Sequence, residues 1–289
     1  MADTDSIHRF LFEHTGIRGH LVRLNASWRA VLDAHPYPDS VRGHLGEALA
    51  AVALLAGTIK FQGSLILQIQ GAGPLRTLVA QATSARTLRG LARWDGAVPA
   101  QGGLAACCGE GRLALTIEGN GAEPYQGIVP LASGGIGEAI EHYFQASEQL
   151  PTRLWLAADH RCAAGLLLQR LPADQGVDDW GRVSLLAGTV RPDELKGLAA
   201  RELLHRLFHE EEVRLFDSEP LAFRCGCSRT RIEDLLRIMG EAEVQSIVTE
   251  QGAVTVTCEF CNRTYRLDAV DAGQLFAQTS QRGSTVLRH

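Results

Sequence analysis

Two close pairs of cysteines near the C-terminal end are the residues of this chain best suited to chemistry. A C-x-C pair and a C-x-x-C pair bring together Cys225, Cys227, Cys258 and Cys261. Two short loops that each carry two thiolates can approach a metal ion from opposite sides and complete the tetrahedral shell that Zn²⁺ prefers. We therefore predict one Zn²⁺ per chain in the reduced state. The alternative is four unrelated core or disulfide-forming cysteines.

A shell closed by four thiolates leaves no position for an activated water molecule. Catalytic zinc sites keep such a position open, so the spacing favours a structural or switching zinc and predicts no catalytic residue. The other three cysteines, Cys107, Cys108 and Cys162, lie among Ala, Gly and Leu residues. Free cysteines in such surroundings behave as small apolar side chains, so we expect these three to be buried in the core.

The composition is that of a cytoplasmic protein with reduced thiols. Residues 1–5 are acidic and lack the basic and apolar regions of a secretory signal. The longest strongly apolar stretch, residues 48–56, has about half of the roughly 20 residues that span a bilayer. The formal net charge of −5 argues against a nucleic-acid partner. We expect a cytoplasmic location, no membrane contact and thiolates that remain available to a metal.

Residues 1–172 show the pattern of an α+β domain, in a chain of 289 residues of which 45% are hydrophobic. A buried helix is predicted from Glu47 to Gly57, with the glycine at its end. Alternation of apolar and polar residues predicts strands over 64–70, 112–118, 125–131, 153–157 and 166–171. The glycine groups at 71–73 and 134–137 complete no phosphate-binding fingerprint, so we expect turns there.

Residues 173–220 are acidic and are predicted to form a helical linker. An apolar stripe at helical spacing consists of Leu203, Leu204, Leu207 and Phe208. We expect this stripe to dock on the N-terminal sheet, and an ordinary interdomain helix would show the same pattern. Glu210–Glu212 are expected on the polar face near the end of this helix, where negative charge opposes the helix dipole by roughly 0.3–1 kcal/mol per group. The element should therefore be marginally stable.

Two histidines on the same predicted helix have the spacing of metal ligands. His205 and His209 are separated by four residues, but Arg206 stands where an H-E-x-x-H motif has glutamate. A solvent-exposed helix face is therefore the expected setting for both.

Residues 221–289 form the predicted metal module. Thr230 and Glu233 suggest a capping box at the start of a helix that Gly240 ends, and residues 254–257 indicate a strand that delivers Cys258. So few large apolar residues cannot be expected to hold the module together, whereas bound zinc contributes about 10–16 kcal/mol in finger peptides. Loss of the metal is therefore expected to unfold the module.

The chain resembles the redox-regulated heat-shock holdase family of bacteria, the 33-kilodalton chaperonins. The two cysteine pairs of the family are found in Phe223–Arg229 and in Cys258–Cys261. Further similar stretches are 54–61, 68–74, 125–129, 147–153 and 204–212. The resemblance covers almost the whole chain and shows no departure at the four cysteines, so it implies that these four bind the zinc.

The resemblance implies an ATP-independent chaperone, not an enzyme, that is inactive when reduced and zinc-bound. Oxidants would convert the thiolates to disulfides, and the family pattern implies the pairs Cys225–Cys227 and Cys258–Cys261. The zinc module and the linker would then unfold and expose apolar surface, which would bind unfolded or partly unfolded client proteins and prevent their aggregation. The resemblance also implies substrate binding by the N-terminal core, residues 1–172, a redox switch in residues 221–289, and a homodimer when oxidised.

Two other functions fit part of the pattern. A zinc ribbon for nucleic acid needs a basic face, but residues 225–270 hold five Arg or Lys residues against seven Asp or Glu residues. A thiol–disulfide oxidoreductase would place C-x-x-C near a βαβ pattern, whereas Cys258 and Cys261 lie between two predicted strands. Two assays separate this second alternative from a holdase. An oxidoreductase would reduce insulin catalytically, whereas a holdase would suppress the aggregation of a client stoichiometrically.

Overall fold

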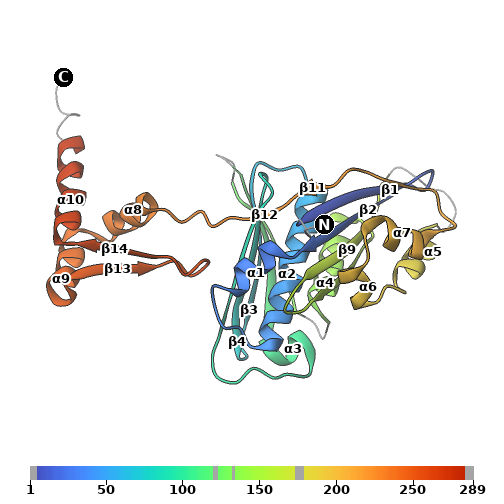
Figure 1. Ribbon diagram of the computed structural model, residues 1–289, viewed down its shortest axis with the longest axis horizontal. Coiled ribbons are helices and arrows are strands. Elements are labelled where there is room, and N and C mark those ends of the chain that lie inside the picture. The colour runs from blue at the N-terminus through green and yellow to red at the C-terminus, as the bar shows by residue number, and fades with distance from the viewer. Residues whose placement is uncertain (1–4, 120–122, 132–133, 173–178, 284–289) are drawn as a thin grey trace. The chain divides into compact units, whose positions relative to one another are not determined.

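The computed structural model describes residues 5–119, 123–131, 134–172 and 179–283 (Figure 1). Contacts within the chain divide it into two compact units, Met1–Arg224 and Cys225–His289. From residue 179 onward, the segment expected as a linker belongs to the first unit. Its beginning, residues 173–178, lies outside the described residues, as do the first four residues of the acidic N-terminal segment and the last six of the metal module.

One antiparallel sheet of the first unit contains the N-terminal strand. Its order is β10-β1-β2-β9-β8, and β11 also pairs with β1. The strands are β1 (Ser6–Phe12), β2 (Ile17–Leu24), β8 (Thr152–Ala158), β9 (Ala163–Arg170), β10 (Val213–Leu215) and β11 (Glu219–Pro220). Both faces are apolar, because Ile7 and Val22 belong to one core cluster and Phe10 and Phe12 to another. This sheet must therefore be covered on both sides.

A second sheet in the first unit has the order β12-β5-β4-β3-β6-β7. Its strands are β3 (Gly63–Gly71), β4 (Leu75–Thr83), β5 (Thr87–Trp94), β6 (Gly111–Gly119), β7 (Tyr125–Pro130) and β12 (Ala222–Phe223). Neighbouring strands are antiparallel, except that β12 runs parallel to β5. The strands predicted by alternation are therefore confirmed as β3, β6, β7, β8 and β9.

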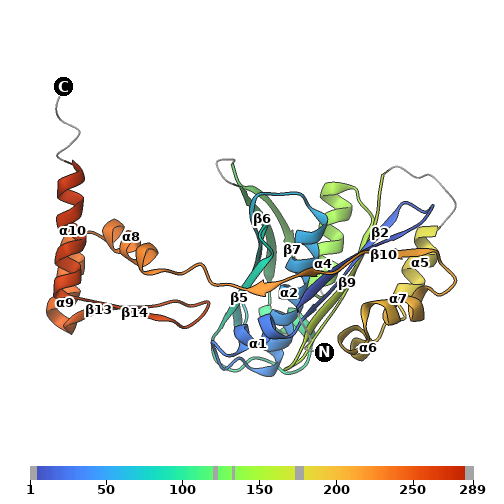
Figure 2. The same ribbon diagram turned by 45° about the horizontal axis from the view of Figure 1, so that its top comes forward.

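Helix α2 (Asp39–Thr58) lies between the two sheets and forms the centre of the first unit (Figure 2). Residues 48–55 are all buried, so this helix is apolar all round rather than along one stripe. The core around it takes side chains from both sheets. Shorter helical elements complete this core: α1 (Ala26–Leu32), α3 (Gly103–Cys108), α4 (Ile136–Tyr143) and the π-helical turn η1 (Phe144–Glu148).

The helix predicted over residues 47–57 is too short, and Gly57 does not end it. α2 extends beyond the prediction at both ends, and its C-terminal cap is Ile59. Gly57 lies at a point of close packing instead, since a Cβ atom there would stand 2.7 Å from Ile7 Cδ1 and 3.1 Å from His20 Cδ2. The glycine therefore allows α2 to approach β1 and β2, and it has no part in termination.

Three helices from the expected linker cover the other face of the first sheet. They are α5 (Asp179–Ala187), α6 (Pro192–Gly197) and α7 (Ala200–Phe208). Leu203, Leu204, Leu207 and Phe208 of α7 are all buried in the cluster that contains Phe10 and Phe12. The Phe208 ring stands edge-on to the Phe12 ring, with centroids 4.9 Å apart, a geometry that adds to the burial of both.

The acidic run Glu210–Glu212 follows α7 instead of lying on it, because the helix ends at Phe208. Glu211 forms an ion pair with Arg182 of α5, so one charge of the run has a specific partner that the sequence did not suggest. His205 on α7 and His209, the residue that caps its end, are both exposed, which confirms the expected solvent exposure of both.

An ion pair also connects α6 with the loop between β8 and β9. Lys196 Nζ lies 2.6 Å from the Asp159 carboxylate. Burial opposes ionisation of Asp159, but the hydrogen bond from Lys196 and two backbone N–H groups outweigh burial and lower its pKa to about 2. Because the folded pKa lies below the usual value, this contribution to stability is present above about pH 4 and is lost as the pH falls towards 2.

The second unit combines a β-hairpin with helices. Its elements are α8 (Arg229–Met239), α9 (Glu241–Gln251), β13 (Ala253–Thr257), β14 (Thr264–Asp268) and α10 (Ala269–Gly283). Its described core consists of seven buried residues: Ile232, Leu236, Val244, Val254, Leu267, Ala272 and Leu275. In the part of the chain that the structure describes, no helix is both long enough and apolar enough to cross a bilayer.

The start of α8 differs from the prediction, whereas its end does not. Ser228 is the N-cap, and its hydroxyl accepts a hydrogen bond from the Arg231 backbone N–H at 3.2 Å. The capping box at Thr230 and Glu233 is therefore wrong, because the helix begins before Thr230 and the nearer serine satisfies its first amides. Gly240 ends the helix with a φ of 99°, as predicted.

Replacing Leu207 by aspartate is expected to loosen α7. Leu207 is 3% exposed, burial of a leucine contributes about 1.5–3 kcal/mol, and an unpaired carboxylate in its place adds a desolvation cost. Hydrogen exchange over residues 195–215 should rise, and the free energy of unfolding should fall by at least about 2 kcal/mol. His205→Asp places the same charge at an exposed position of α7 and should change neither quantity. Unchanged exchange in Leu207→Asp would contradict the docking of α7 through this residue.

Candidate metal centre

Each cysteine pair is held by the element next to it. Cys225 and Cys227 immediately precede the Ser228 cap of α8, so the start of that helix fixes the C-x-C loop. Cys258 and Cys261 lie in the turn between β13 and β14. Two backbone hydrogen bonds close that turn: Cys258 N–H donates to Arg263 O at 2.9 Å, and Asn262 N–H donates to Cys258 O at 2.7 Å. A helix start and a hairpin turn thus present two thiols each.

The four thiols converge on one point. All four Sγ atoms lie within 4.8 Å of one another, and each residue is partly exposed. Two close contacts cross between the pairs, with Cys225 Sγ 3.5 Å from Cys258 Sγ and Cys227 Sγ 3.4 Å from Cys261 Sγ. A tetrahedral shell with metal–sulfur bonds of about 2.3 Å separates neighbouring sulfurs by about 3.8 Å. The arrangement therefore fits a single four-coordinate metal ion.

A tyrosine hydroxyl also reaches this cluster. Tyr265 of β14 donates a hydrogen bond to Cys227 Sγ at 3.2 Å. Burial alone would raise the pKa of the Cys227 thiol, but this bond and the other three thiols outweigh burial and lower that pKa to about 7. Burial raises the pKa of the Cys261 thiol, and the neighbouring thiols act in the same direction. Of these two thiols, Cys227 is therefore the one that ionises more readily.

The alternation of Tyr265 with Leu267 predicts only that Tyr265 lies on a strand. Its hydroxyl reaches the cluster because Tyr265 pairs with Val256, near the end of β13 that delivers Cys258. In the sequence, the signal for this contact is an aromatic residue with a polar hydroxyl group close to a cysteine pair.

The three remaining cysteines lie in the first unit, apart from this cluster. Cys107 and Cys108 of α3 and Cys162 before β9 are all buried, which confirms the expectation from their small apolar neighbours. Burial raises the pKa of Cys108 and of Cys162 to about 11 each, so both remain protonated thiols at neutral pH. Their environment is that of inert core residues.

Comparison with known proteins connects this site to a family. The chain matches the family model described as Hsp33 protein over residues 5–268. A 33 kDa chaperonin of Nitrosococcus oceani is 58% identical over the full length of both chains. The chain belongs to the Hsp33 family. A 33 kDa chaperonin of Pseudomonas paraeruginosa, 44% identical over the full length of both chains, is a further relative. The resemblance inferred from the sequence motifs is thus confirmed.

The fold is also shared with a solved structure. The crystal structure of the 33 kDa chaperonin (Heat shock protein 33 homolog) from Thermotoga maritima has a TM-score of 0.83 and covers 96% of this chain and 99% of its own. At 23% identity this likeness bears on the fold alone, and with the observed elements it confirms the predicted α+β class. Membership in the Hsp33 family supports a chaperone function, and the names of the relatives are consistent with a protein that is not an enzyme.

Purified under reducing conditions, the chain is expected to carry one metal ion at this site. The Cys258→Ser, Cys261→Ser double variant should lose it, with the metal content falling from about one ion per chain to near zero, because two thiolates are only half of the shell. Cys162→Ser removes a buried thiol of the first unit and should leave the metal content unchanged. Metal analysis with thiol titration provides the measurement. Stoichiometric metal in the double variant would overturn the assignment.

Proposed function

We propose that this chain is a redox-regulated, ATP-independent holdase that binds unfolding proteins after its cysteines are oxidised and protects them from aggregation under oxidative and heat stress. The proposal rests on four mutually adjacent thiols in a unit whose described core has seven buried residues. A metal ion bound there would supply much of the stability of that unit. Membership in a chaperone family supports the binding of client proteins.

Zinc is the metal that the donor set supports. Thiolates are soft ligands that select Zn²⁺ over hard cations such as Mg²⁺ and Ca²⁺, and four of them in a tetrahedral array are typical of structural zinc. The spread of the four Sγ atoms, within 4.8 Å of one another, accommodates the Zn–S bond length. Zinc, when bound, would keep Cys225, Cys227, Cys258 and Cys261 deprotonated, and the thiolate is the form that oxidants attack.

Oxidation by peroxide removes two electrons for each disulfide. One thiolate attacks the peroxide to give a sulfenic acid and hydroxide, and a second thiolate then displaces hydroxide from that sulfur to form the S–S bond. Two peroxides therefore consume all four thiolates, and the ion is left without ligands. From the family resemblance we propose the pairs Cys225–Cys227 and Cys258–Cys261. The small ring of a C-x-C disulfide is strained, so this bond should be readily reduced again.

Release of the metal would unfold the second unit and weaken the helices that cover the first sheet. Bound zinc contributes about 10–16 kcal/mol in small metal-dependent domains, and without it the burial of seven apolar residues has to offset the conformational entropy of the whole unit. We propose that α5, α6 and α7 then leave the face that contains Phe10 and Phe12. An exposed apolar face of this kind binds unfolded or partly unfolded clients.

A thiol–disulfide oxidoreductase that uses Cys258 and Cys261 is the alternative. Reactive C-x-x-C thiols typically stand at a helix N-terminus, whereas this pair lies in a hairpin turn between β13 and β14, and burial raises the pKa of Cys261. The turn therefore disfavours the alternative. Rapid catalytic reduction of insulin, without suppression of client aggregation, would favour the oxidoreductase over the holdase.

Three further parts of the proposal concern the protein in the cell. We expect a cytoplasmic location, because metal-bound thiolates require a reducing compartment. We expect clients to be bound by the N-terminal core, residues 1–172. We also expect the oxidised protein to be a homodimer, which size-exclusion chromatography with light scattering measures directly.

Peroxide with mild heat is expected to release one zinc ion per chain, lower the helical content and start client protection, and a thiol reductant should reverse all three. The reason is that loss of the metal would unfold the second unit and release the helices α5, α6 and α7 from the apolar sheet. A chelating dye, far-ultraviolet dichroism and light scattering by an aggregating client give the three readouts. Cys162→Ser should behave like the unchanged chain. Full protection by reduced, zinc-loaded protein at ordinary temperature would contradict the switch.

The Leu207→Asp variant is expected to uncover the face of the first sheet that α7 packs on without loss of the metal. If exposure of the sheet face is what binds clients, this variant should protect a client partially without oxidant while it still holds about one zinc ion per chain. His205→Asp should remain inactive until oxidised. A Leu207→Asp protein with raised hydrogen exchange but no activity before oxidation would place client binding on another surface.

A further inference from the structure

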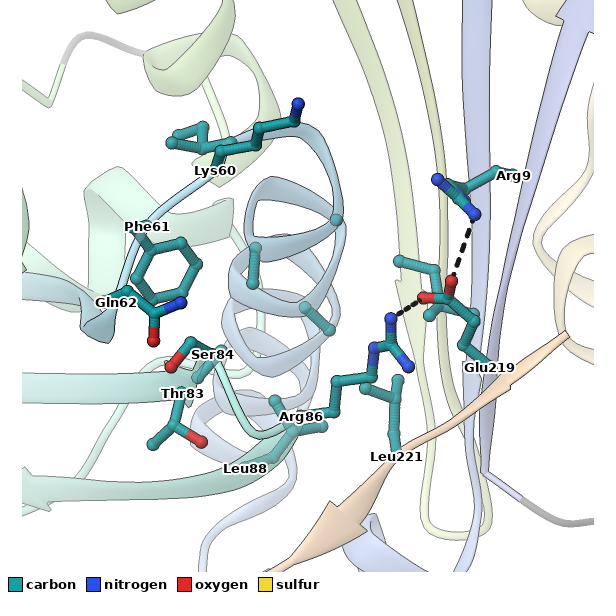
Figure 3. A pocket seen from close by; sticks show the side chains of 16 residues that line it. Arg9, Lys60, Phe61, Gln62, Thr83, Ser84, Arg86, Leu88, Glu219 and Leu221 are labelled. Carbon is teal, nitrogen blue, oxygen red and sulfur yellow. Dashed lines mark ion pairs between the residues drawn. The ribbon is translucent and has the colours of Figure 1, made fainter.

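A cavity of about 560 Å³ lies at the C-terminal end of α2 in the first unit (Figure 3). Apolar side chains and three cations line it, the cations being Arg9, Lys60 and Arg86. One carboxylate, that of Glu219, lies between the two arginines (Figure 3). The cavity therefore combines an apolar wall with a cluster of positive charge.

Residues 219–223, which we call the strap, close one side of this cavity and connect the two sheets. β11 pairs with β1 in an antiparallel manner, and β12 pairs with β5 in a parallel manner. Backbone N–H groups of Leu221, Ala222 and Arg224 donate to the carbonyls of Asp5, Arg86 and Leu88 at 3.0, 3.2 and 3.0 Å. Because these bonds involve main-chain atoms alone, any extended segment can form them.

Alternate side chains of the strap are inserted into the first unit. Glu219 pairs with Arg86, and with Arg9 at 3.2 Å. Leu221 is 9% exposed in the main core and Phe223 packs against that core, whereas the two intervening residues are exposed. Peptide-binding grooves that add a strand work in the same way: main-chain bonds hold the peptide, and pockets for every second side chain select it.

The strap is a short element that is joined directly to the metal centre. Each of its strands has two residues, fewer than the three to ten that are usual. Arg224 follows the strap, and the next residue is Cys225. Unfolding of the second unit would therefore leave the strap with one untethered end, held by few bonds.

We propose that the strap is the internal occupant of a client-binding groove, and that this groove receives an extended acidic segment of an unfolded protein. The segment has a carboxylate followed two residues later by an aliphatic side chain. The carboxylate takes the place of Glu219 between Arg9 and Arg86, the aliphatic side chain takes the place of Leu221, and the backbone uses the same carbonyls. This groove would have clients only if the chain is the holdase proposed above. The chemical class of the client segment that it binds is the new element.

Charge explains why the segment is acidic. With the strap in place, three cations and one carboxylate give the groove a net charge of +2, and without the strap the charge is +3. The chain as a whole carries −5, so this positive site is a local exception. Complementary charge favours an acidic segment over a basic one in both binding rate and selection of partner.

A peptide with the sequence of residues 217–224, labelled with a fluorophore, is the probe for this groove. The receptor is the full chain, reduced and zinc-loaded, either unchanged or with Leu221→Asn. In the unchanged chain the tethered strap competes at a high effective concentration, so the peptide should bind weakly. Leu221→Asn weakens that competitor and leaves the arginines intact, so the peptide should bind at least about tenfold more tightly in fluorescence anisotropy. Asp217→Asn, which changes an exposed carboxylate just before the strap, should bind like the unchanged chain.

Charge reversal tests the role of the arginines. In the Leu221→Asn background, a peptide with glutamine in place of its glutamate should bind about tenfold more weakly. Adding Arg86→Glu should weaken the original peptide and restore binding of a peptide with lysine at that position. If dichroism shows that Leu221→Asn does not fold, Glu219→Gln, which keeps the leucine, takes its place. Absence of peptide binding to the folded variant, or equal binding of the glutamate and glutamine peptides, would overturn the proposal.

The groove and the redox switch can fail separately. The peptide assay uses reduced protein and needs no oxidant. Peptide binding to Leu221→Asn together with no client protection after peroxide would refute the switch and support the groove. Client protection after peroxide, with no peptide binding to any strap variant, would refute the groove alone.

Discussion

In the proposed function, the second unit depends on its four-thiol cluster because its apolar core is small. Its described core contains seven buried residues, of which one is an alanine and none is aromatic. Three large apolar side chains of α8 add little to this core, because Leu235, Ile238 and Met239 are 49%, 85% and 47% exposed. Small domains of this kind require a metal or disulfides in addition to burial. Under the proposed function, the chemistry of four sulfur atoms decides whether the unit is folded.

The first unit has the opposite character. Its centre is a helix buried between two sheets. One sheet is apolar on both faces, so α5, α6 and α7 are needed to cover the face that α2 does not. This arrangement would suit the proposed holdase, because the binding face could be exposed while the centre of the domain stays folded. The strap is a second cover of this kind, over the cationic cavity.

The sequence predicts those features that are encoded by spacing. Close cysteine pairs predict the thiol cluster, and the helical stripe predicts the buried face of α7. The early part of α2 is missed because residues 39–46 contain two glycines and only two large apolar side chains, Val41 and Leu45, which are too few to show a helical period. The strap is missed because two-residue strands are shorter than one alternation. The contact of Tyr265 with Cys227 depends on hairpin register, which the sequence leaves open.

Loop closure explains why oxidation can unfold the second unit although it also forms covalent bonds. A metal ion that joins the two cysteine pairs closes the loop of residues 228–257, and in the chain-entropy model a cross-link over about 30 residues stabilises the fold by about 4 kcal/mol. The proposed disulfides each close a ring of three or four residues, worth about 2 kcal/mol at most, and neither joins one pair to the other.

The core of the second unit is divided by that loop. Ile232, Leu236, Val244 and Val254 lie within residues 228–257, whereas Leu267, Ala272 and Leu275 lie beyond them. Once the long-range link is lost, the two halves of the core are held together by the β13–β14 hairpin, by the packing of α10 on α8 and α9, and by the Arg229–Asp271 ion pair. Disulfides within each pair do not restore that link, because they constrain residues that are already neighbours. Reduction followed by metal binding does restore it, so the same four sulfur atoms can make folding of this unit reversible.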